Sequence, residues 1–101
     1  MLTGYKRLER AGLMEQNINR LLETAKTAAQ SGDSVSAEQF YKQTLRVAEA
    51  LYGEDSAGVS SVLLEMEEFY EAQHRPDEAK QVRDRMSRIM AQYIKDVRPD
   101  K

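Results

Sequence analysis

A chain of 101 residues, with 41% hydrophobic and 32% charged residues, has the composition of one small globular domain and is too apolar for a disordered tail. A net charge of −2 gives no overall attraction to nucleic acid or anionic lipid, and the absence of cysteine excludes disulfides, thiol nucleophiles and thiolate metal sites. We expect a cytoplasmic protein, because no apolar run resembles a signal peptide or reaches the ~20 residues that span a membrane.

Apolar residues recur every three or four positions along the chain, and no segment alternates as a strand does. This pattern predicts an all-α fold with four main helices, near residues 14–31, 35–52, 57–73 and 76–96. Residues 1–13 are expected to form either a short capping helix or a frayed tail. The apolar residues of that segment are Leu2, Tyr5 and Leu8.

Turn and capping residues separate the predicted helices. Gly32 is expected to end the first helix, with Asp33 or Ser34 as the N-cap of the second. Pro76 stands where the first turn of a helix tolerates proline, and Asp77 follows near the positive end of the helix. The helices are therefore expected to be joined by short loops.

Similar residues recur at an offset of 42 positions. The matching pairs are Leu21 with Leu63, Leu22 with Leu64, Glu23 with Glu65, Ala37 with Ala79, Gln39 with Gln81, Arg46 with Arg88, and Val47 with Ile89. One shared register across two helix pairs predicts a duplicated helix–turn–helix unit. Chance similarity between amphipathic helices is the alternative interpretation.

Two segments carry a family resemblance: AEQFYKQTLRVAEALYGEDS in the first unit and VSSVLLEMEEFYEAQHRPDEAKQV in the second. On these motifs the chain resembles the tetratricopeptide repeat (TPR) family, in the longer repeat typical of kinesin light chains. The resemblance implies a fragment of a right-handed α-solenoid. It would consist of two antiparallel hairpins within residues 14–98, at about 14–52 and 57–96.

Three positions depart from the repeat pattern. Glu67 stands at the position of Ala25 in the first unit, and Arg83 at the position of Tyr41. A charge is costly to bury unpaired between helices. Either the second unit is terminal and these side chains face water, which we prefer for Arg83, or the two form an ion pair. His74 stands where the family often has glycine, so that turn is expected to be either strained or differently shaped.

No catalytic or metal-binding pattern is found in the sequence. The single histidine, His74, has no cysteine partner and no Ser/Asp arrangement at a recognisable spacing, so a solvated turn residue is favoured over a catalyst. Four glutamates between residues 65 and 71 spread around one helix and match no ion-binding loop. We expect no enzyme activity, no cofactor and no metal.

The resemblance implies a non-enzymatic protein–protein interaction module, an adaptor or scaffold that binds a peptide or helix of a partner protein. In the family, the first helix of each repeat lines the binding groove. The corresponding positions are Asn19, Leu22, Glu23, Lys26, Gln30, Ser61, Leu64, Glu65, Glu68 and Glu71. The family's frequent asparagine pair is replaced by Leu-Glu in both units, which favours an apolar, acid-rimmed groove for a helix with basic flanks.

Two units bury less surface than the three that repeat proteins commonly need. We therefore expect a homodimer, formed through the last predicted helix by Met86, Ile89, Met90, Tyr93, Ile94 and Val97. The alternative function is a small helical bundle whose apolar faces serve only homo-oligomerisation, without a groove for a partner. Nucleic acid is not expected as a partner, because only Tyr93 lies among the basic residues. A membrane is not expected either, because the net charge gives no attraction to anionic lipid.

Overall fold

The computed structural model describes the backbone of residues 2–97 and the side chains of residues 12–95. It contains four helices: α1 (Leu2–Gln30), α2 (Ser34–Tyr52), α3 (Ala57–Ala72) and α4 (Pro76–Val97). No strand is present in this part of the chain, so the all-α prediction is confirmed. None of the helices as described combines the length and apolar character that crossing a bilayer requires.

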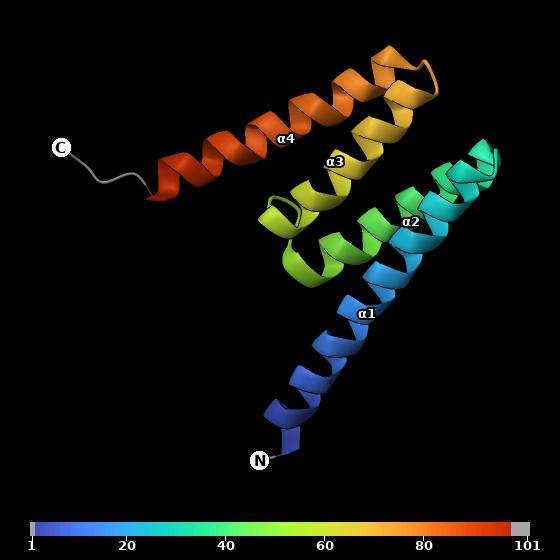
Figure 1. Ribbon diagram of the computed structural model, residues 1–101. Coiled ribbons are helices and arrows are strands. Elements are labelled where there is room, and N and C mark those ends of the chain that lie inside the picture. Colours follow the sequence, from blue (N-terminus) through green and yellow to red (C-terminus); the bar gives the residue numbers. More distant parts are fainter. Residues whose placement is uncertain (1, 98–101) are drawn as a thin grey trace.

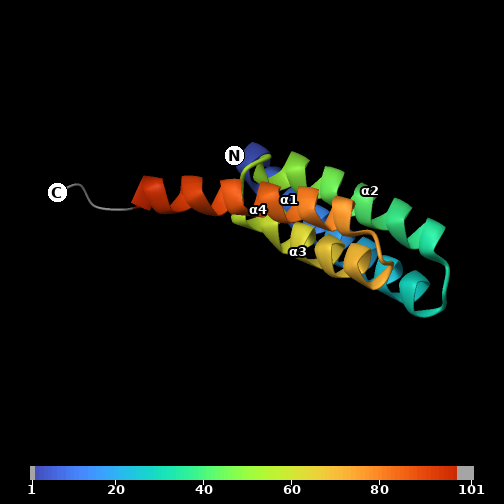
Figure 2. The same ribbon diagram turned by 90° about the horizontal axis from the view of Figure 1, so that it is seen from above.

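Consecutive helices run antiparallel and form two hairpins, α1/α2 and α3/α4, joined by packing of α2 on α3 (Figure 1). In Figure 2, α2 and α4 lie along the upper side, and α3 and the second half of α1 along the lower side. The Cα atoms extend over 47 × 43 × 14 Å. A thickness of 14 Å fits two layers of helices whose axes are about 8–10 Å apart, so the molecule is a flat double layer.

The two hairpins have matching boundaries. Helix α1 ends at Gln30 and α3 ends 42 residues later, at Ala72. Helix α2 begins at Ser34 and α4 begins 42 residues later, at Pro76. The offset found between similar residues is therefore also the offset between corresponding helix ends.

The turns within the hairpins also share their backbone hydrogen bonds. The Asp33 N–H donates to the Ala28 carbonyl, and the Arg75 N–H donates to the Tyr70 carbonyl, both at 2.9 Å. This bond from the sixth residue back to the first is typical of the Schellman motif, which satisfies carbonyls at the end of a helix. Both hairpins thus turn by the same local device.

The same device places one residue of each turn in the left-handed backbone region. Gly32 has φ of 89°, and His74, at the equivalent position, has φ of 60°. Glycine adopts this conformation freely, whereas the Cβ of histidine makes it costly. The expectation of a strained turn at His74 is confirmed.

Replacing His74 with glycine is expected to raise the free energy of unfolding by about 0.5–1 kcal/mol, because relief of the left-handed strain exceeds the entropy that glycine loses on folding. Urea denaturation measures the change. The control is Gly32→Ala at the equivalent turn, which is expected to lower stability by about 1 kcal/mol. A loss of stability in His74→Gly would contradict the interpretation.

The core is built mainly on α3. Its buried hydrophobic residues are Ile18, Ala25, Ala37, Tyr41, Ala48, Val59, Val62, Leu63, Met66, Phe69, Tyr70, Ala79 and Ile89. Six of these thirteen belong to α3, because this helix packs against both α2 and α4. The other helices bury narrower faces. Buried alanines occur on each of them, and the small side chain of alanine permits close helix packing.

The N-terminal segment differs from the expectation of a separate short helix or a frayed tail. Helix α1 continues without a break from Leu2 to Gln30, and its first turns extend past the end of α2 (Figure 1). Gly12 is the only helix-disfavouring residue near the expected boundary, and one glycine costs only about 1 kcal/mol. The side chains of Leu2, Tyr5 and Leu8 lie outside the described residues, so their packing stays a prediction.

Candidate functional site

A groove of about 350 Å³ lies between α1 and α3, with α2 beneath it. The lining residues that matter for its chemistry are Lys26 and Gln30 from α1, Tyr41 from α2, and Glu65, Glu68 and Phe69 from α3. Each hairpin contributes one wall, so the groove exists only when the two hairpins are packed together.

Two aromatic rings form the floor of this groove. The rings of Tyr41 and Phe69 have centroids 5.2 Å apart and are inclined at 45°. Both side chains are buried. The Tyr41 hydroxyl has no hydrogen bond to a described residue, but its oxygen is not fully shielded from solvent. That hydroxyl is therefore open to a ligand in the groove.

Carboxylates outnumber cations around the floor. Lys26 Nζ lies 3.5 Å from Glu65 Oε2 and 4.0 Å from Glu23 Oε2. Burial raises the pKa of Tyr41, and the negative charges of Glu65, Glu68 and Glu23 raise it further. Three carboxylates thus act on the floor against one ammonium group, which favours a positively charged ligand.

The structure brings together four of the ten groove residues expected from the sequence, namely Lys26, Gln30, Glu65 and Glu68. Glu23 adjoins them through its contact with Lys26. Leu22 is half-buried and packs against the core. The exposed side chains Asn19, Ser61 and Leu64 lie on the same two helices, outside the residues that line the groove.

Glu71 does not belong to the groove. Its Oε2 atom lies 3.3 Å from Arg83 Nη1, so the side chain is directed toward α4. The reason is rotation along the helix: Glu71 follows Glu68 by three residues, a step that moves the side chain round toward the neighbouring helix. Conversely, the floor residues Tyr41 and Phe69 were not among the expected groove residues, because the apolar spacing predicts that both are buried in the core.

Arg83 faces water and also forms an ion pair. Its Nη1 atom lies 2.7 Å from Glu67 Oε2, and its side chain is 47% exposed. The Glu67 carboxylate raises the pKa of the guanidinium. The expectation that Arg83 faces water is therefore confirmed, and the ion pair with Glu67 that was offered as the alternative is present as well.

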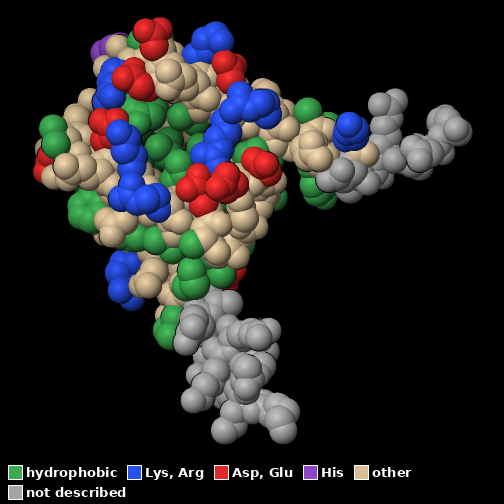
Figure 3. Space-filling model, turned by 180° about the vertical axis from the view of Figure 1, so that it is seen from behind, with side chains coloured by type: hydrophobic (Ala, Val, Ile, Leu, Met, Phe, Trp, Pro, Cys, Tyr) green, Lys and Arg blue, Asp and Glu red, His purple; other side chains and the backbone are tan. Residues whose placement is uncertain are grey.

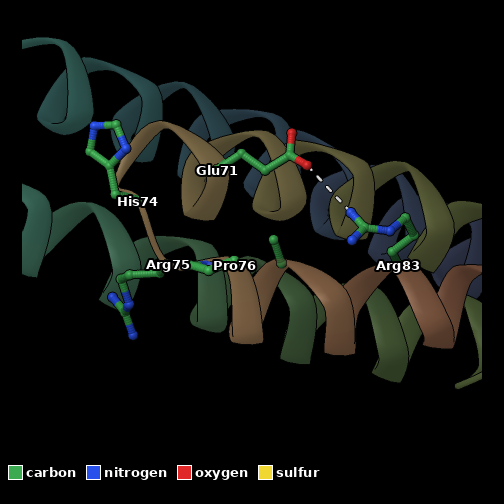
Figure 4. A pocket seen from close by; sticks show the side chains of 6 residues that line it. Glu71, His74, Arg75, Pro76 and Arg83 are labelled. Atoms are coloured by element: carbon green, nitrogen blue, oxygen red, sulfur yellow. Dashed lines mark hydrogen bonds and ion pairs between the residues drawn. The ribbon is translucent and has the colours of Figure 1, made fainter.

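A second hollow, of about 410 Å³, lies at the turn between α3 and α4, and His74 lines it. In Figure 4, His74 and Arg75 point to opposite sides of the turn, while Glu71 reaches toward Arg83. His74 is exposed and has no hydrogen bond through its ring to a described residue. Among the side chains of residues 12–95, no three His, Cys, Asp or Glu residues are grouped as metal ligands would be.

A cluster of polar side chains joins the two hairpins at the level of this turn. Arg75 donates from Nη1 to Glu38 Oε1 at 2.8 Å and from Nη2 to Glu38 Oε2 at 3.1 Å. The Tyr70 hydroxyl donates to Glu38 Oε2 at 2.9 Å, and the Arg75 guanidinium lies 4.9 Å from the centre of the Tyr70 ring. Glu38 therefore ties α2 to the second hairpin.

This cluster changes the ionisation of its members. The Arg75 guanidinium, aided by the Tyr70 hydroxyl, lowers the pKa of Glu38 from 4.5 to about 2. Burial, together with the Glu38 carboxylate, raises the pKa of Tyr70 to about 12.

Figure 3 shows the face that carries α2 and α4, where acidic and basic side chains surround an apolar centre. One ion pair joins the two helices of this face, since Arg85 Nη2 lies 2.8 Å from Glu49 Oε2.

The residues expected to mediate self-association divide into two groups. Ile89 is 4% exposed and belongs to the core, so its assignment to an outer surface is wrong. Met90, Tyr93 and Ile94 are exposed by 59%, 60% and 50%, and Met86 is half-buried. The side chain of Val97 lies outside the described residues.

No protein-family model, curated protein or solved structure matches this chain. Its class therefore rests on its own architecture. The chain is an all-α protein of two antiparallel hairpins that share one turn design and enclose an acidic groove with an aromatic floor.

Proposed function

We propose that this protein is a non-enzymatic protein-interaction module, a TPR-like adaptor or scaffold, whose α1/α3 groove binds a basic peptide or helix of a partner protein. The observation that carries the proposal is the aromatic floor of Tyr41 and Phe69 beneath the carboxylates of Glu23, Glu65 and Glu68. The recurrence of helix ends and turn bonds after 42 residues supports the repeat character.

The groove offers three kinds of contact to such a ligand. Its carboxylates attract lysine or arginine side chains, and the open hydroxyl of Tyr41 can bond to a peptide backbone. Leu64, which is 49% exposed on the same helix as Glu65 and Glu68, adds an apolar contact beside the acidic rim. A segment with basic and apolar side chains matches this combination. A cytoplasmic location is part of the proposal.

The proposal is tested with a synthetic amphipathic helix that has leucine on one face and lysine on the other. We expect amide shifts on titration to concentrate at Lys26, Glu65, Glu68 and Phe69, because these residues line the groove. The matched peptide has glutamine in place of lysine and is expected to bind much more weakly. Equal binding of the two peptides, or shifts spread evenly over the surface, would contradict an acidic groove.

Reversing one rim charge provides a second measurement. Glu68→Lys is expected to weaken binding of the lysine-bearing peptide roughly tenfold, because one attraction is replaced by a repulsion. The control is Glu54→Lys, which makes the same change at an exposed position in the loop between α2 and α3, away from the groove. Calorimetric titration measures both. An equal loss in the two variants would mean that only the net charge matters.

A further inference from the structure

An apolar hollow of about 420 Å³ lies along one side of α4, outside the core and the groove. It is lined by Arg83, Met86, Ser87, Met90, Ala91 and Ile94. Met90 is 59% exposed and Ile94 is 50% exposed. These two exposed apolar side chains, one helical turn apart and next to the hollow, form a contiguous apolar patch on this side of α4.

One end of the hollow touches the rest of the molecule, because Arg83 pairs with Glu67 of α3 and Met86 packs against the core, whereas Met90 and Ile94 are exposed. On the opposite side, Arg85 Nη2 lies 2.8 Å from Glu49 Oε2 of α2. On a third side, Ile89 is buried in the core. The hollow is therefore at the outer end of the double layer, beyond the last helix.

The repeat shows what kind of surface this is. Its lining residues correspond, 42 positions earlier, to Tyr41, Thr44, Leu45, Ala48, Glu49 and Tyr52 of α2. Within that set, Tyr41, Thr44 and Ala48 are buried, with exposures of 4%, 0% and 0%. Helix α3 packs on α2. The hollow on α4 is thus the counterpart of a surface that a helix covers in the first hairpin.

The other end of the molecule does not offer a matching helix. The buried α3 residues Val59, Val62, Met66 and Phe69 correspond in α1 to Asn17, Arg20, Thr24 and Thr27. The latter four are polar, and three of them are exposed. Helix α1 of another copy would therefore bring a polar face to the apolar hollow, which disfavours head-to-tail stacking. The apolar surface that can cover the hollow is therefore the same hollow of a second copy, as in a symmetric dimer.

We infer that two copies of this protein form a dimer through the outer side of α4, with the two α4 helices antiparallel about a two-fold axis near Met90. Ser87 and Ala91 are small enough for the helices to approach closely. Met86, Met90 and Ile94 supply the apolar contact, and methionine side chains adapt readily to a facing surface. The occupant of the hollow is thus the α4 helix of the second copy.

Charged residues along one edge of the hollow favour the antiparallel direction. Asp84 and Lys95 are exposed and eleven residues apart, which is close to three helical turns, so they lie on one side of α4. Asp84 precedes Met90 by six positions and Lys95 follows it by five. An antiparallel pair places Asp84 beside Lys95 of the second copy, twice by symmetry. A parallel pair would place Asp84 and Lys95 of the two copies at different levels and on opposite edges of the interface, so neither ion pair could form.

Light scattering on the whole chain tests the dimer. The wild-type mass is expected to be twice the 11.6 kDa of one chain. Met90→Glu is expected to reduce it to that of one chain while circular dichroism shows unchanged helix content. The control is Val35→Glu, because Val35 is 71% exposed on α2 and does not line the hollow, and this variant is expected to stay dimeric. A monomeric wild type, or a dimeric Met90→Glu variant, overturns the inference.

Charge exchange tests the direction of the helices. Asp84→Lys and Lys95→Asp are each expected to weaken the dimer roughly tenfold in sedimentation equilibrium, and the double variant is expected to restore it. Failure of the double variant to recover overturns the antiparallel arrangement. These residues lie outside the α1/α3 groove, so peptide binding to the groove and dimer formation can each fail without the other.

Discussion

Replacing Leu63 with alanine is expected to lower the free energy of unfolding by about 2–5 kcal/mol. Leu63 is 2% exposed and is among the largest of the fully buried side chains. It lies on α3, the helix that packs against both neighbours, so the surrounding side chains are held from two sides and cannot collapse into the cavity. Small domains are stable by only about 5–15 kcal/mol, so this one change removes a large share of the total.

The next residue provides the matched control. Leu64→Ala makes the same chemical change on the same helix, but Leu64 is 49% exposed. We expect its effect on the free energy of unfolding to stay within about 0.5 kcal/mol. Urea denaturation followed by circular dichroism measures both variants. Similar losses for the two leucines would contradict the burial that distinguishes them and would remove Leu64 as a residue available for binding.

The existence and order of the four helices were predictable because local signals agree. The apolar spacing of three and four, the turn at Gly32 and the proline at position 76 all act within a few residues of one another. Even the strain at His74 was expected, because the repeat pattern that the chain resembles often has glycine at this position. The boundary near residue 13 failed for the opposite reason, because a single glycine is too weak a signal to end a helix.

The rotation of each helix about its own axis was less predictable. Ile89 and Met90 are adjacent and both apolar, yet one is buried and the other is 59% exposed. Glu68 and Glu71 are both acidic, yet only Glu68 lines the groove, while Glu71 turns toward Arg83. Periodicity defines an apolar stripe, but neighbouring helices decide which edge of the stripe is covered. Such choices depend on tertiary packing and are not encoded in spacing alone.

The two proposed surfaces are compatible in one assembly. The dimer surface lies at the outer end of the double layer, and the groove opens between α1 and α3. A two-fold axis perpendicular to the layer would direct both grooves to the same side of the dimer. A partner with two basic segments would then gain avidity, provided that its linker spans the two grooves.

Replacing Glu38 with glutamine is expected to lower the free energy of unfolding by about 1–3 kcal/mol at neutral pH. The change removes the charge that accepts two hydrogen bonds from Arg75 and one from Tyr70, and with it the tie between α2 and the second hairpin. The upper end of that range is limited because the Arg75 side chain is 36% exposed, so water screens the pair. Thermal and urea denaturation measure the loss.

The pH dependence of this difference identifies its cause. The pKa of Glu38 is 4.5 when unperturbed and about 2 in the folded protein, where the Arg75 guanidinium stabilises the carboxylate. A lowered folded pKa contributes stability that is present above the unperturbed value and is lost as the pH falls through the folded value. The gap between wild type and Glu38→Gln is therefore expected to be full above about pH 5 and to close toward about pH 2.

An exposed ion pair serves as the control for this prediction. Glu71→Gln removes a carboxylate that is 57% exposed and lies 3.3 Å from Arg83, so its effect on stability is expected to stay below about 0.5 kcal/mol. A gap between wild type and Glu38→Gln that persists unchanged down to about pH 2 would show that shape or packing of the side chain, and not its charge, joins the hairpins. Closure of the gap in that range assigns the tie to the ionised carboxylate, because protonation alone then reproduces the effect of the substitution.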